Sequence, residues 1–109
     1  PHGRALSIAA VAFMQYTCEA DHARYARVAR ILGADPTLSD EEAARQSPVL
    51  MEQFLKDAGM ETHLGELGVR EDQIGLIADV ACSSMAYCMG VTLRPLAHDD
   101  LVAMLELSL

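Results

Sequence analysis

The histidines carry the most readily identified chemistry of this 109-residue chain, because neutral imidazole is the commonest metal-binding side chain. His2 stands between Pro1 and Gly3, shortly before an apolar stretch that starts at Ala5. Proline fixes its own φ angle and glycine lets another group approach closely, so this opening could present an imidazole to a metal ion. The alternative is that His2 has no role, because chain ends are usually poorly ordered.

The other candidate ligands form no recognisable set. His22 and His98 are expected at the starts of helices as neutral capping or surface residues, and His63 is expected in a surface turn. The three cysteines are odd in number and show no CxxC pair, which indicates reduced thiols rather than a disulfide framework or a zinc knuckle. A metal bound by His2 would therefore need ligands from elsewhere, because one ligand does not make a site.

Composition limits the classes of partner. The chain has 16 acidic and 8 basic side chains and a formal net charge of −8, which argues against a nucleic-acid surface. The longest apolar stretch, residues 8–14, is too short to span a bilayer and lacks the cationic flank of a secretion signal. No glycine motif for a dinucleotide or nucleotide phosphate is present. We expect a cytoplasmic protein with no nucleic-acid or membrane partner.

The elements that must position these residues are predicted to be helices. Hydrophobic periodicity predicts an all-α fold of five to six helices in one domain over residues 1–109. The first helix, about residues 4–16, is apolar on nearly every side, so we expect the others to pack around it as a buried N-terminal helix. No segment alternates with period two between turn signals, so no strand is predicted.

Capping residues set the expected boundaries of the later helices. A second helix begins at Asp21 and ends at Gly33, and a third begins with a capping box at Ser39. At Pro48 this third helix either kinks or gives way to a new helix capped by Ser47. A short turn is expected within residues 60–69, a fifth helix over 71–86 with Met85 on its inner face, a loop over 88–96, and a last helix from about residue 98.

Four stretches of the chain resemble, in the same order, a known family. These are Pro1-His2-Gly3 before the apolar helix, RYARVARILG at residues 24–33, LGELGVREDQI at residues 64–74, and Arg94-Pro95-Leu96 followed by Asp99-Asp100-Leu101-Val102. Together they resemble the C-terminal part of the iron-dependent (group III) alcohol dehydrogenases. The resemblance covers essentially the whole chain.

The resemblance implies that the chain is a C-terminal fragment of a two-domain enzyme. The upstream N-terminal part would bind NAD(P), and the helical part would hold Fe(II) or Zn(II) through one Asp and three His. His2 would be the last metal ligand, and Cys88 would line the substrate pocket. The parent would interconvert alcohols with aldehydes or ketones by hydride transfer, and it could form a homo-oligomer.

The sequence also departs from the family pattern. Thr92 and Leu93 replace the Asn-Pro that usually precedes the arginine, which changes the shape of the expected pocket. The other metal ligands, a proton-relay histidine and the nucleotide-binding part would all lie upstream of Pro1. The segment alone is therefore expected to be inactive and to hold neither the metal nor NAD(P).

Two further hypotheses stay open. One is a hydroxyacid–oxoacid transhydrogenase of the same family, whose pattern resembles the ILGAD stretch at residues 31–35. The other is a non-enzymatic acidic helical adaptor that binds a protein partner through an exposed apolar groove. The first helix distinguishes the adaptor from the enzyme segment, because in the enzyme upstream helices would shelter it.

Overall fold

The computed structural model describes residues 2–109 and is all-helical over that range, as the periodicity predicts. Pro1, which was expected to fix the backbone before His2, lies outside the described residues. The α helices are α1 (His2–Thr17), α2 (His22–Ile31), α3 (Asp40–Asp57), α4 (Ile74–Ser84), α5 (Ala86–Gly90) and α6 (His98–Leu107), with 3₁₀ turns η1 (Cys18–Ala20), η2 (Leu64–Leu67) and η3 (Glu71–Gln73). Within residues 2–109, no helix is long and apolar enough to cross a membrane.

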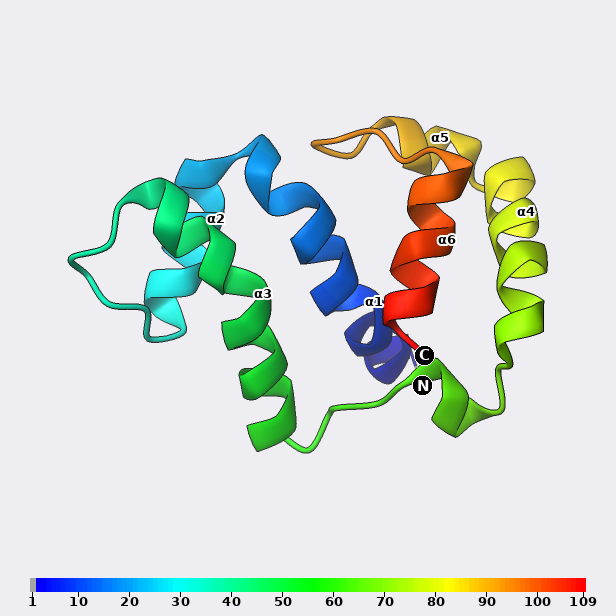
Figure 1. Ribbon diagram of the computed structural model, residues 1–109, viewed down its shortest axis with the longest axis horizontal. Helices are drawn as coiled ribbons and strands as arrows, with labels where there is room; N and C mark the ends of the chain where they lie inside the picture. The colour runs from blue at the N-terminus through cyan, green and yellow to red at the C-terminus, as the bar shows by residue number, and fades with distance from the viewer. Residues whose placement is uncertain (1) are drawn as a thin grey trace.

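The other helices pack around α1. Figure 1 shows α2 and α3 on one side of α1, and α4 and α6 on the other; α1 contacts both α3 and α6. The burial of α1 is uneven, because Ala12, Met14 and Thr17 are buried whereas Leu6 is 59% exposed. The expected burial of this helix is therefore confirmed for three residues of its second half, whereas residues 2–6 and Gln15 are exposed.

The predicted ends of α2 and α3 are confirmed. The Asp21 carboxylate accepts a hydrogen bond from the Arg24 amide at 3.0 Å, and the Ser39 hydroxyl accepts one from the Glu42 amide at 3.2 Å. Gly33 has a φ angle of 104°, a left-handed conformation that glycine adopts without steric cost. The two helices pack closely through small residues, because Ala26, Ala29 and Ala43 are fully buried between them.

The structure resolves the two alternatives at Pro48 in favour of one helix. α3 runs from Asp40 to Asp57 with Pro48 inside it. Proline has no amide hydrogen, so the carbonyl of Ala44 loses its usual helical donor. The hydroxyl of Ser47 donates to that carbonyl at 2.7 Å, and both Ser47 and Ala44 are fully buried. The side chain expected to cap a new helix therefore replaces the bond that proline removes.

The fifth predicted helix ends two residues earlier than expected, at Ser84 rather than Ala86. It consists of η3, then α4, and it ends where Met85 leaves the helical region with φ −124° and ψ 24°. Ile74 and Ala78 are buried as predicted, but Met85 is 52% exposed rather than part of the core. The short helix α5 then occupies residues 86–90, so the predicted loop starts only after Gly90. The change of backbone direction at Met85 turns its side chain away from the inner face of α4.

The last residues of the chain close the bundle against η2. The amide of Leu64 donates to the carbonyl of Ser108 at 2.8 Å, and the amide of Gly65 donates to the carbonyl of Leu109 at 3.3 Å. A Cβ atom at residue 65 would lie 3.1 Å from that Leu109 oxygen, so glycine permits the close approach. Figure 1 shows this contact beside the start of α1.

Replacing Ser47 with alanine is expected to lower the free energy of unfolding by about 1–3 kcal/mol, because the buried carbonyl of Ala44 would lose its donor. The measurement is urea denaturation of the wild type and the variant. Ser83→Ala is the matched control, because the Ser83 hydroxyl also donates to a backbone carbonyl but is exposed. A Ser47→Ala effect no larger than that of the control would contradict the proposed role of this hydroxyl.

Candidate functional site

His2 is the first residue of α1, and its side chain is exposed. Among residues 2–109, no group of three or more His, Cys, Asp or Glu is arranged to hold a metal ion. An imidazole at an exposed helix end remains open to ligands from other polypeptide segments. The chain can therefore offer one ligand of a coordination sphere rather than a complete metal site.

Helical periodicity places His2 on a continuous stripe of α1. Side chains at spacings of i, i+4, i+7, i+11 and i+14 share one face of a helix, so His2 lies in line with Leu6, Ala9, Phe13 and Tyr16. We call this stripe the His2 face. Leu6 and Ala9 are exposed, whereas Phe13 and Tyr16 are partly covered. The open part of the stripe is thus the part nearest the imidazole.

At the other end of the His2 face, Tyr16 holds the loop that follows α5. Its hydroxyl lies 2.7 Å from the Pro95 carbonyl oxygen and 3.0 Å from Asp100 Oδ2, so one proton is shared between two acceptors. The Arg94 guanidinium lies 4.0 Å from the centre of the Tyr16 ring and donates to the Tyr16 carbonyl at 3.2 Å. We call these four residues the Tyr16 cluster.

The electrostatics of the Tyr16 cluster are consistent with its hydrogen bonds. Burial and the hydrogen bond to Asp100 raise the pKa of Tyr16, so its hydroxyl keeps its proton at neutral pH. The Ala97 amide, 3.0 Å from Asp100 Oδ2, and then the Tyr16 hydroxyl lower the pKa of Asp100. An ionised Asp100 therefore accepts from a protonated Tyr16 and from the amide of Ala97, the residue before α6.

Cys88, the other predicted site residue, lies in α5, and its side chain is exposed. Figure 1 shows α5 beside α4 and α6, with the loop after it reaching toward the C-terminal end of α1, whereas His2 begins α1 at the opposite end. A helix rises about 1.5 Å per residue, so His2 and Tyr16 are roughly 21 Å apart along the axis. The structure does not bring the two predicted site residues together, and the pocket-lining role of Cys88 stays a prediction.

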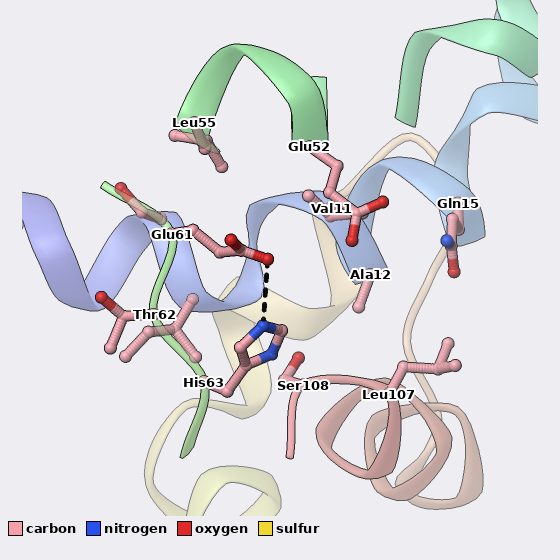
Figure 2. Close-up of a pocket in the computed structure, with 12 residues that line it drawn as sticks. Val11, Ala12, Gln15, Glu52, Leu55, Glu61, Thr62, His63, Leu107 and Ser108 are labelled. Carbon is pink, nitrogen blue, oxygen red and sulfur yellow. Dashed lines mark hydrogen bonds and ion pairs between the residues drawn. The ribbon is translucent and has the colours of Figure 1, made fainter. Parts of the chain in front are cut away.

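A cavity of about 240 Å³ opens on a different face of α1 (Figure 2). Its lining comes from four separate parts of the chain: Ser7, Ile8, Val11, Ala12 and Gln15 of α1, Glu52 and Leu55 of α3, residues 61–63, and Leu107 and Ser108. Neither His2 nor Cys88 lines it. His63 Nε2 lies 3.3 Å from Glu61 Oε1 within it, so His63 is a half-buried cavity residue rather than a simple surface one.

His98 begins α6 and is exposed, as expected, and it contacts two carboxylates. Its Nε2 atom lies 2.7 Å from Asp79 Oδ1 on α4, and its Nδ1 atom lies 3.4 Å from Asp99 Oδ1. These hydrogen bonds, with Asp79 the stronger cause, raise the pKa of His98 above its ordinary 6.5. The His98 imidazole thus links α4 to α6 at the surface.

Comparison with known proteins identifies the origin of this arrangement. The model of the "Fe-containing alcohol dehydrogenase family, C-terminal" matches residues 1–109. The chain belongs to the Fe-containing alcohol dehydrogenase family. It corresponds to the C-terminal part of that family's members, which confirms the resemblance seen in the four sequence stretches.

Individual relatives agree with the family assignment. The chain is 29% identical over 103 residues to the lactaldehyde reductases of Escherichia coli K12 and O157:H7, which covers 94% of this chain and 26% of each relative. Its fold is similar to the crystal structure of an archaeal halo-thermophilic alcohol dehydrogenase from a Red Sea brine pool, with a TM-score of 0.85. The two sequences are 24% identical, and the match covers 100% of this chain and 28% of that one. The chain spans about a quarter of the length of these relatives.

Replacing Tyr16 with phenylalanine is expected to loosen residues 91–97, because both hydroxyl contacts disappear while the ring remains. Hydrogen exchange at the Leu96 and Ala97 amides should accelerate about five- to tenfold, which corresponds to one or two lost hydrogen bonds. Tyr25→Phe is the matched control, because its hydroxyl contacts Thr17 at the same end of α1 but not the loop. The same hydrogen-exchange rates at the Leu96 and Ala97 amides in Tyr16→Phe and Tyr25→Phe would contradict the role of the Tyr16 hydroxyl.

Asp79→Asn is expected to lower the pKa of His98 towards 6.5, measured from its imidazole NMR shifts. A histidine whose pKa is raised in the folded state contributes stability below its unfolded pKa of about 6.5, and this contribution disappears as pH rises through the folded value. The wild type should therefore lose the His98 contribution above pH 6.5, and the variant should lack most of it. Asp72→Asn is the control, because Asp72 lies on η3 and pairs with Arg70. The same His98 titration in the wild type, Asp79→Asn and Asp72→Asn would refute the prediction.

Proposed function

We propose that this chain forms the C-terminal, metal-binding helical part of an NAD(P)-dependent alcohol dehydrogenase that uses Fe(II) or Zn(II). The parent enzyme would interconvert alcohols with aldehydes or ketones by hydride transfer. The observation that carries the proposal is an exposed imidazole at the first turn of α1, His2, in a chain that matches the family over its whole length.

The donor chemistry of His2 fits such a metal. A neutral imidazole nitrogen is a suitable ligand for both iron and zinc. The exposed helix end leaves room for the Asp and the two further His ligands, which the longer polypeptide would supply. When bound, the ion would supply Lewis acidity to an alcohol or carbonyl oxygen, which suits hydride exchange with a nicotinamide.

The remaining residues of the His2 face would shape the surroundings of the reacting groups. Leu6 and Ala9 present apolar surface next to the imidazole and would exclude water once the upstream part covers them. The Tyr16 cluster would fix the opposite end of the His2 face. We propose that Cys88, which is exposed on α5, lines the substrate pocket of the complete enzyme.

The transhydrogenase hypothesis gains no support from the stretch on which it rests. Gly33 ends α2 in the left-handed conformation, and Ala34 is buried. The Asp35 carboxylate accepts hydrogen bonds from the amide and the hydroxyl of Thr37 at 2.9 and 2.8 Å, which lower the pKa of Asp35. These local roles account for the residues without a substrate, and the family match supports the enzyme segment over the adaptor.

In the complete enzyme, His2→Ala is expected to reduce metal affinity and alcohol oxidation together, because one ligand is lost. A decrease of about 10- to 100-fold or more in affinity is the expected scale for a disturbed coordination sphere. The measurements are metal content by mass spectrometry and the rate of NAD(P) reduction. His22→Ala, at the first position of α2, is the matched control. Unchanged metal content in His2→Ala would rule out the ligand assignment.

A further inference from the structure

The cavity between α1, α3 and α6 has a lining that the proposed dehydrogenase chemistry does not use (Figure 2). We propose that this cavity binds a small organic cation: a primary ammonium group on a short aliphatic chain. The proposal concerns a second binding site, so it does not depend on whether His2 binds a metal ion.

The negative charge of the lining selects a cation. Figure 2 shows the carboxylates of Glu52 and Glu61 in the same cavity. Glu52 extends from α3, and Glu61 extends from the segment before η2. Glu61 is already paired, at 3.3 Å with His63 and at 3.8 Å with Lys56. No ion pair involves Glu52 among residues 2–109. One carboxylate thus remains without a partner beside a partly enclosed space, where charge interactions are stronger than in open water.

Arg4, at one end of the cavity, forms no ion pair with Glu52. Arg4 lies on α1 one turn before the cavity, and its guanidinium donates to the Thr62 hydroxyl at 2.9 Å. This contact keeps Arg4 at the end of the cavity formed by residues 61–63. The formal charge of the whole chain, −8, also favours the approach of a cation over that of an anion.

Buried hydroxyl groups add hydrogen-bond acceptors to the cavity. Ser108 and Thr62 are only 5% and 7% exposed, and both line the cavity. The Ser108 hydroxyl uses its proton on the Met104 carbonyl at 2.8 Å, so its oxygen lone pairs remain to accept from an N–H donor. An ammonium group has three such donors and no acceptor, which matches carboxylate and hydroxyl oxygens.

The remaining walls suit a short aliphatic chain. Ile8, Val11, Leu55 and Leu107 are aliphatic, and they face the same space as the carboxylates. A volume of about 240 Å³ corresponds to about eight water molecules at roughly 30 Å³ each, enough for an amine of four to six carbons.

The test compares n-butylammonium with n-butanol and butanoate, which share its chain but differ in charge. Binding to the complete protein is measured by saturation-transfer NMR titration. We expect n-butylammonium to bind at least about tenfold more tightly than n-butanol, because a charge-assisted contact adds to the same apolar burial, and we expect no saturable binding of butanoate. Equal affinity for n-butylammonium and n-butanol would overturn the proposal, because it would reveal only an apolar cavity.

Two variants and a control locate the site. Glu52→Gln should weaken n-butylammonium binding about tenfold, the scale of one lost charge-assisted contact. Glu106→Gln, an exposed change on α6 outside the cavity, should leave binding unchanged. Val11→Phe should fill the space and abolish binding while both carboxylates remain. Equal weakening by Glu52→Gln and Glu106→Gln, or normal binding to a folded Val11→Phe variant, would overturn the proposal.

Discussion

The structure depends on the packing of the second half of α1 against α3 on one side and α6 on the other. The small and medium side chains Ala12, Met14 and Thr17 are buried there, and this contact joins the α2–α3 pair to the α4–α6 pair. Because apolar burial contributes in proportion to the area removed from water, the buried half of α1 stabilises the bundle while its first half stays open. One helix therefore serves as core at one end and as a candidate ligand-bearing surface at the other.

Several elements of the fold could be predicted because their signals are local. Asp21, Gly33 and Ser39 mark helix ends through their own backbone and side-chain preferences, and each does so in the structure. Met85 could not be placed, because the apolar period continues in the sequence after the backbone has left the helix. The outcome at Pro48 depends on whether the Ser47 hydroxyl donates to the Ala44 carbonyl or caps a new helix. The same sequence permits both, so it could not decide between them.

The candidate site shows the same division between local and distant information. His2 could be singled out because its residue type and its position before an apolar helix are visible in the sequence. The cavity could not be predicted, since its lining comes from segments up to 101 residues apart, from Ser7 to Ser108. The Tyr16 cluster was missed for the same reason: its contacts join residues separated by 78 to 84 positions. Only the fold brings such groups together.

The hydrogen bonds from Leu64 and Gly65 to the carbonyls of Ser108 and Leu109 have a practical consequence for protein engineering. Ser108 also lines the cavity, so a substitution that weakens the contact of residues 108–109 with η2 would also displace a side chain of the cavity lining. An affinity handle or a fluorescent reporter attached after Leu109 would pull on the η2 contact. A flexible glycine–serine spacer would move such a fusion partner away from the bundle.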